Sequence, residues 1–271
     1  MIITNQITSL FMGKLDFKTG LWFPVKKIIW KEKQNDSYKD CSIHFVKGAQ
    51  MYSSLYSERK NLFIPKDLNR IMKYKDLIQS PLRNRIPVAR ALEKEVAICL
   101  GFNSDFPIDP VEFLARDGGY RHGDLYDIFP EVAPDKRGNY NFLFRGIDIW
   151  TMSTNNKPEL ETIPTQANVI IKLPQRKIVP GEWKKPMLES PPEAIRAKMY
   201  VKNQMVGYAP HYIQELYQQF KEQLKIEVFQ VNFGVPFEYQ FLFLATVNQT
   251  LAEIPYSSEK FRLLNTDGHQ I

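Results

Sequence analysis

Short apolar runs separated by polar turns dominate the first fifty residues of the chain. Apolar side chains gather at positions 2–11, 21–30 and 42–46, and the polar segment 18–20 is a turn signal between the first two runs. Runs of this length predict a small antiparallel β meander. His44 alternates with apolar neighbours in the third run, so we expect it to be a structural histidine and not a ligand.

The spacing becomes helical further along. Apolar side chains recur every three to four positions from Val88 to Leu100, and Gly101 stands where a helix C-cap belongs. A second short helix is predicted after Asp109, which is an N-cap candidate, because Pro110 suits the first helical position.

The second half of the chain is again β-rich, with one helix. Candidate strands occupy residues 140–150, 167–173, 194–201, 204–208, 226–233 and 238–247, and a helix is predicted at about 210–224. In the tail, Phe261, Leu263 and Leu264 could form one added edge strand. The strongest hydrophilic turn lies near residues 135–140. We therefore predict an α+β protein with a front domain over 1–135 and a β-rich rear domain over 136–271.

The positions of the charged residues indicate where an anionic partner could bind. The 271 residues carry a net charge of +6, and ten basic against four acidic residues between 57 and 94 hold all of it. That stretch includes Arg83 and Arg85, and it is either a phosphate-binding stripe or a solvated helical face. A second basic cluster over 172–185 contains Lys172, Arg176 and Lys177, with Glu182 as its single acidic residue.

Aromatic residues accompany the second basic cluster. Tyr200, Tyr208, His211 and Tyr212 belong to the neighbouring strands and helix start. Cations beside aromatic rings on a β surface are what single-stranded nucleic acid requires, because bases stack on rings and phosphates meet cations. The competing interpretation is that these rings pack in the core.

No catalytic motif occurs in the sequence. Phosphate-binding glycine loops, zinc-protease and serine-hydrolase motifs and kinase signatures are all missing, so we expect no enzyme, cofactor or metal. His122, Asp124 and Asp127 could together provide a base or a metal site. The alternative for that segment is a glycine-permitted turn followed by a strand over 125–132. Cys41 and Cys99 are expected to be buried reduced thiols.

The apolar runs are short throughout. The stretch 241–245 is far below the roughly 20 residues that a membrane helix needs. The first residues do not have a basic segment followed by a continuous apolar one, so no signal peptide is expected. We therefore expect a cytoplasmic protein without a membrane partner.

Two blocks in the rear half resemble a known module. Residues 190–201 followed by Met205-Val206-Gly207-Tyr208-Ala209-Pro210 look like the centre of a HIRAN domain, in which a strand, a Gly-Tyr-x-Pro turn and a helix follow one another. The resemblance covers about residues 140–248. It implies a small β-barrel-like module that binds DNA, in one branch single-stranded 3′ ends, with Tyr208 and His211 as candidate stacking or phosphate-facing residues. The family's Asn-Pro-x-Asp-x-Asn turn is replaced here at 188–193, where Glu189 and Glu193 would repel phosphate.

A second resemblance involves the front half. The segments 84–101 and 109–119 are similar to the amino-terminal subdomain of HipA-type toxin kinases over about residues 1–130, and the kinase portion is missing. Together the two resemblances predict a non-enzymatic nucleic-acid-binding protein that recognises single-stranded or damaged DNA in bacterial genome maintenance or phage defence. The alternative is a regulatory protein-interaction module acting with a separately encoded HipA-type kinase or a defence complex, such as one with a nuclease.

Overall fold

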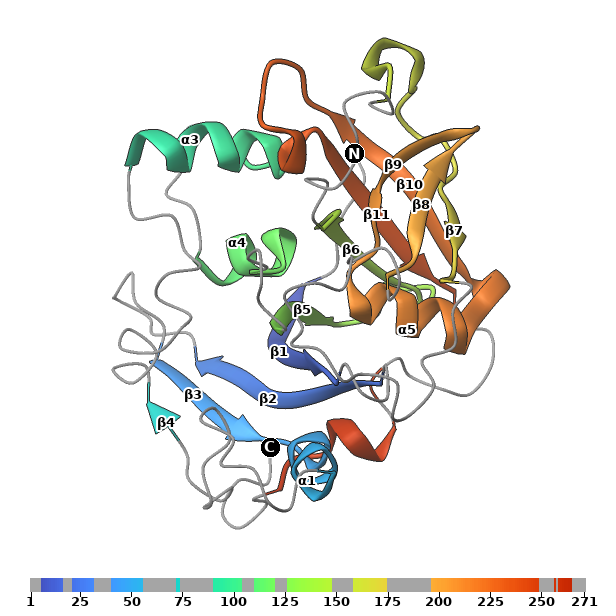
Figure 1. Cartoon of the computed structure of the whole chain (residues 1–271). Coiled ribbons are helices and arrows are strands. Elements are labelled where there is room, and N and C mark those ends of the chain that lie inside the picture. The colour runs from blue at the N-terminus through green and yellow to red at the C-terminus, as the bar shows by residue number, and fades with distance from the viewer. Residues whose placement is uncertain are drawn as a thin grey trace, which may run out of the picture.

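A computed structural model gives the fold (Figure 1). It describes residues 6–16, 21–31, 40–55, 72–73, 90–103, 110–119, 126–147, 158–174, 196–248, 256 and 258–264. The described chain is mixed α+β, with antiparallel sheets and short helices, as the sequence predicts. Within these ranges, none of the helices has both the length and the apolar character needed to cross a membrane.

The front half forms a five-stranded antiparallel sheet. Its strands are β1 (Ile7–Leu15), β2 (Trp22–Lys31), β3 (Asp40–Phe45), β4 (Met72–Lys73) and β5 (Tyr126–Val132), in the order β4-β3-β2-β1-β5. Because β1, β2 and β3 are consecutive neighbours, the predicted meander is confirmed. The strand expected at 125–132 is also confirmed, and as β5 it pairs with β1.

Short helices occur in the chain between β3 and β5 and directly after β3. The two predicted helices are confirmed as α3 (Arg90–Cys99) and α4 (Pro110–Asp117), whereas α1 (Lys47–Ser54) gives no clear signal in the sequence. Leu100 and Phe113 from the α3–α4 region pack on the outer side of the rear half, against Leu143, Leu242 and Leu244. The 3₁₀ turns of the described chain are η3 (Leu160–Thr162), η6 (Lys221–Gln223), η7 (Phe237–Tyr239) and η8 (Glu259–Phe261).

The rear half contains two three-stranded sheets and one longer helix. The first sheet has the order β10-β11-β6, with β6 (Tyr140–Arg145), β10 (Leu224–Val231) and β11 (Phe241–Val247). The second has the order β7-β8-β9, with β7 (Ile170–Lys172), β8 (Lys198–Val201) and β9 (Gln204–Tyr208). All six predicted strands are confirmed, and the predicted helix is α5 (His211–Phe220), which continues into η6.

Hydrogen bonds link the two small sheets at both of their edges. Beyond β6, the Ile147 backbone N–H donates to the Tyr208 carbonyl at 2.9 Å. Before β7, the Val169 backbone N–H donates to the Ile226 carbonyl at 2.9 Å, and Asn168 bridges to Glu227. The six strands are therefore connected in the order β6-β11-β10-β7-β8-β9 and back to β6.

The largest hydrophobic cluster contains residues from both predicted domains. Phe11, Trp22 and Phe129 of the front sheet pack in the same cluster as Tyr212 and Phe243 of the rear half. The boundary at 135 stays a prediction about chain position, but the segments on its two sides share one core.

The described part of the C-terminal tail does not form the expected edge strand. Phe261 lies in the 3₁₀ turn η8 because its side chain enters the core, where it packs edge-on against Phe11. Leu263 makes an isolated antiparallel bridge with Val46, and the Lys47 N–H donates to the Arg262 carbonyl at 2.8 Å. The tail thus fastens the start of α1 through backbone hydrogen bonds.

The close contact of α1 with β2 yields a stability prediction. A Cβ added at Gly48 would lie 2.0 Å from the carbonyl oxygen of Pro24, so the helix would have to move away from the strand. We expect Gly48→Ala to lower the free energy of unfolding by about 1–3 kcal/mol, the usual cost of overpacking. Urea unfolding measures this change. Exposed Gln50 on the same helix is the control, and Gln50→Ala should shift stability by less than about 0.5 kcal/mol. Equal effects of the two substitutions would contradict the prediction.

Candidate functional site

The outer surface of β7 and β8 carries cations beside an aromatic ring. Side chains alternate along a strand, and Ile171, Met199 and Val201 turn into the core. The residues between them therefore face outward. Because the register pairs Ile170 with Tyr200 and Lys172 with Lys198, these four side chains form one patch, which we call the β7–β8 face.

Lys172 and Tyr200 are in direct contact on the β7–β8 face. The Lys172 Nζ lies 4.3 Å from the centroid of the Tyr200 ring, which is a cation–π arrangement. Ile170 beside them is 53% exposed, unusually high for an isoleucine. A partly exposed ring, an exposed aliphatic side chain and two ammonium groups can together stack a base and hold a phosphate.

Three of the expected stacking or phosphate-facing residues are buried. The exposed fractions of Tyr208, Tyr212 and His211 are 1%, 2% and 4%. Tyr212 stacks on Phe129 of the front sheet at 4.9 Å between ring centroids, and its faces are therefore used within the core. These three rings therefore pack in the core, as the competing interpretation of the sequence predicts. A base could reach them only if the core opened.

The remaining expected residues divide into two groups. Lys172 lies on the β7–β8 face, whereas Arg83, Arg85, Arg176 and Lys177 lie outside the described residues. Sequence reasoning missed Lys198 as a partner of Lys172. The alternation of polar and apolar residues over 198–201 was the signal that could have found it, since it places Lys198 and Tyr200 on the same side of a strand.

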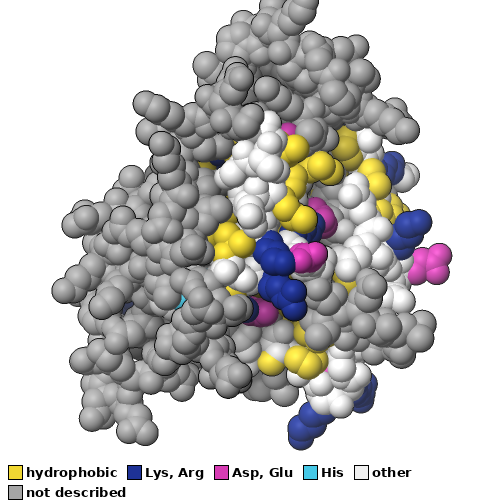
Figure 2. Space-filling view, turned by 90° about the horizontal axis from the view of Figure 1, so that it is seen from below, with side chains coloured by type: hydrophobic (Ala, Val, Ile, Leu, Met, Phe, Trp, Pro, Cys, Tyr) yellow, Lys and Arg dark blue, Asp and Glu magenta, His cyan; other side chains and the backbone are white. Residues whose placement is uncertain are grey.

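Cations on another side of the molecule are matched by carboxylates. Figure 2, seen from below Figure 1, shows Lys and Arg side chains beside Asp and Glu side chains on the described surface. The ion pairs Lys47–Glu259 and Lys260–Glu215 connect the C-terminal segment to α1 and α5. Such paired charges add little net potential for a polyanion.

A buried ion pair joins the front and rear halves beneath these surfaces. The Arg145 Nε of β6 donates to Asp117 Oδ1 at the end of α4, at 2.6 Å. Burial alone would lower the pKa of the Arg145 guanidinium, but the adjacent Asp117 carboxylate, together with Tyr239 and Glu238, outweighs burial and raises that pKa. Burial, together with Asp117, raises the pKa of the nearby Tyr239 hydroxyl to about 12. At neutral pH the Arg145 guanidinium is therefore charged and the Tyr239 hydroxyl is neutral, and the contact has a structural role.

A second buried contact involves Asp127. This residue is the described member of the possible base or metal site that also includes His122 and Asp124. Its Oδ1 accepts a hydrogen bond from the Trp22 indole N–H at 2.7 Å, and its Oδ2 lies 3.7 Å from His211 Nδ1. His122 and Asp124 are outside the described residues. In the described ranges, no three His, Cys, Asp or Glu side chains are grouped to hold a metal ion.

His44 and Cys99, also singled out for their chemistry, behave as structural groups, whereas the Cys41 side chain lies outside the described part of the chain. His44 is buried, and its Nε2 lies 2.9 Å from the Ser42 hydroxyl oxygen. Cys99 is a free, buried thiol, and burial raises its pKa. A raised pKa keeps the thiol protonated and unreactive at neutral pH.

Comparison with known proteins adds no relative. No protein-family model, curated protein or solved structure matches the chain.

The Arg145–Asp117 pair yields a prediction about stability. We expect Arg145→Met to cost about 3–5 kcal/mol of unfolding free energy, because it leaves the Asp117 carboxylate buried without its counter-ion. The double variant Arg145→Met/Asp117→Asn should recover part of that loss, and a double-mutant cycle in urea measures the coupling. Strictly additive single effects would contradict a direct interaction.

The burial of His211 yields a prediction about pH. Burial lowers the pKa of His211 below 6.5, although Asp127 opposes the shift. The unfolded chain therefore binds this proton more readily than the folded chain does. The stability contribution is complete above about pH 6.5 and is lost as the pH falls below it. We expect urea midpoints of the wild type to decline between pH 7.5 and 5, and those of a His211→Gln variant to decline less. Parallel profiles would rule out His211 as the source.

Proposed function

We propose that the chain is a non-enzymatic nucleic-acid-binding protein that holds single strands on the β7–β8 face. The contact between Lys172 and the partly exposed Tyr200 ring carries this proposal. Lys198 lies opposite Lys172 across the strand pair and adds a second cation to the same face. A ring can stack any base, so this arrangement favours single strands over a specific duplex sequence.

The affinity of such a face comes mainly from phosphates and is therefore salt-dependent. Each cation that neutralises a phosphate of a single strand contributes about −0.7 to the slope of log K against log salt. Exposed Ile170 adds apolar contact for a sugar or a base edge. Two cations give a modest affinity at physiological salt, which suits a protein that samples exposed strands and releases them.

The closed hydrogen-bonded order of β6, β11, β10, β7, β8 and β9 supports a finer proposal for the rear half, a HIRAN-like barrel. The block Gly207-Tyr208-Ala209-Pro210 occurs at the end of β9, directly before α5. The Tyr208 carbonyl accepts the hydrogen bond from Ile147 that joins β9 to β6. In this proposal the motif tyrosine has a structural role, and strand binding is carried by Tyr200. The proposed setting is bacterial genome maintenance or phage defence in the cytoplasm.

A second candidate function is a regulatory protein-interaction module, for example with a separately encoded HipA-type kinase. Two exposed apolar side chains favour it, Phe233 at 60% and Ile98 at 47% exposure. The β10–β11 connection that carries Phe233 is fastened to the end of α3, because the Asn232 side chain donates to the Cys99 carbonyl at 3.0 Å. A Phe233→Ser variant should lose a protein partner in co-purification while its oligonucleotide binding is unchanged.

Strand binding by the β7–β8 face is tested by fluorescence anisotropy with a labelled single-stranded 20-mer over a salt series. We expect Tyr200→Ala to weaken binding by about 1–3 kcal/mol, through lost stacking. Lys172→Ala should weaken it for all sequences and make the slope of log K against log salt shallower by about 0.7.

The matched control is Lys136→Ala, at an exposed lysine in the 135–139 turn. It should leave both affinity and slope unchanged. Wild-type protein that does not bind the 20-mer at low salt, or that binds it without a salt slope, would refute the proposal.

A further inference from the structure

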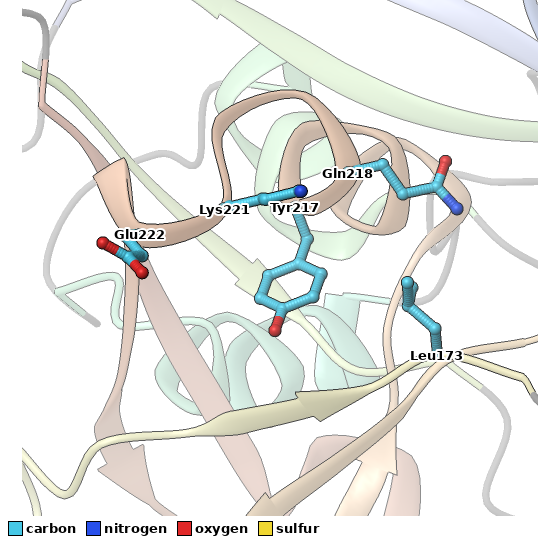
Figure 3. Close-up of a pocket in the computed structure, with 5 residues that line it drawn as sticks. All are labelled: Leu173, Tyr217, Gln218, Lys221 and Glu222. Carbon is cyan, nitrogen blue, oxygen red and sulfur yellow. The ribbon is translucent and has the colours of Figure 1, made fainter.

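A hollow of about 540 Å³ lies where β7 ends beside the end of α5 (Figure 3). Leu173 lines it from the β7 side, Tyr217 and Gln218 from α5, and Lys221 and Glu222 from η6. Its volume is within the range of about 300–1,000 Å³ that is typical of small-molecule sites. Leu173 directly follows Lys172, the last residue of β7, so the hollow lies at the end of that strand.

Tyr217 divides the hollow. Figure 3 shows its ring projecting into the open space, with Gln218 and Leu173 on one side and the Glu222 carboxylate on the other. Tyr217 is partly buried and packs against the main core, which holds its ring in place. One side of the hollow thus combines an aromatic face, an aliphatic side chain and an amide.

The backbone turns sharply at the edge of the hollow. Lys221 ends α5 with φ 42° and ψ −107°, a combination that favours glycine. Non-glycine residues in sparsely populated backbone regions cluster at ligand-binding sites, where strain is part of the site. The lysine that occupies this position supplies a cation that a glycine would not.

We infer that this hollow is a subsite for an adenine nucleotide, an inference that rests on the proposed function. The base stacks on Tyr217 and contacts Leu173. The Gln218 amide has both a donor and an acceptor, which match adenine N7 and the adenine N6 amino group. Lys221 neutralises the phosphate. The Glu222 carboxylate repels phosphate from the opposite side, so it favours one direction of entry.

The adenine could belong to a strand that continues from the β7–β8 face, or to a free nucleotide. Three probes separate these sources: labelled oligo(dA), labelled oligo(dT) of the same length, and AMP as a competitor. We expect wild-type protein to bind oligo(dA) about tenfold more tightly than oligo(dT), the lower part of the range for one bidentate base contact. Displacement of oligo(dA) by micromolar AMP would identify the free nucleotide as the ligand.

The decisive variant is Gln218→Glu, which keeps the size of the side chain and removes the donor to N7. We expect it to abolish the preference for oligo(dA). Gln219→Glu is the matched control, because Gln219 is exposed on the same helix, does not line the hollow and undergoes the same charge change. Its preference should equal that of the wild type.

Lys221→Gly gives an independent readout. Relief of the backbone conformation should raise the melting temperature, while loss of the cation should weaken binding of oligo(dA) and of AMP. A merely structural lysine would show the first effect without the second.

The outcomes distinguish the two proposals. If neither oligonucleotide binds at low salt, the proposed function fails and the subsite fails with it. If both bind equally, depend on Tyr200 and respond alike to Gln218→Glu and Gln219→Glu, the subsite is refuted and the β7–β8 face stands.

Discussion

The packing of β5 against α5 is the contact on which both halves of the molecule depend. Asp127 and Phe129, two positions apart on β5, face the same way, as alternation along a strand requires. Phe129 stacks on Tyr212, and Asp127 lies beside His211, so two consecutive residues at the start of α5 are fixed by two residues of the front sheet. Because α5 is held there, Tyr217 and Gln218 one to two turns later are also held, and they line the hollow beyond β7. A surface feature of the rear half therefore depends on a buried contact with the front half.

Much of the fold was predictable from local pattern. The strands β6 to β11, the meander of β1 to β3 and the helices α3, α4 and α5 follow apolar periodicities of two or of three to four residues. The helix α1 escaped prediction because its apolar content is low and its stability comes from its fit against β2. The edge strand expected around Phe261 is reduced to a single bridge between Leu263 and Val46, because the Phe261 side chain enters the core and the backbone turns there.

The candidate site was predictable only in part, for a physical reason. The sequence around His211, directly after Pro210, is the same whether this side chain faces solvent or a buried carboxylate, so the sequence does not distinguish the two cases. The Asp127 carboxylate that neighbours His211 lies far away in sequence, and no local pattern predicts it. The contact between the Lys172 ammonium and the Tyr200 ring depends on the register between β7 and β8. The spacing of apolar residues along the sequence does not predict that register. Net charge did not predict where a phosphate-binding surface lies, because it does not show which cations are paired. The described residues Lys27 and Lys225 lie in ion pairs with Glu131 and Glu227. Lys172 instead lies over the Tyr200 ring.

The segment around Phe261 also has a consequence for biosynthesis. Backbone hydrogen bonds from Lys47 to Arg262 and from Leu264 to Phe45 join the third strand and first helix to residues made more than two hundred positions later. Phe261 fills the space beside Phe11 and Trp22 in the first two strands. The amino-terminal sheet consequently cannot complete its core while the ribosome is still translating the rear half. Its apolar face can be fully covered only after residues 261–264 have left the ribosome.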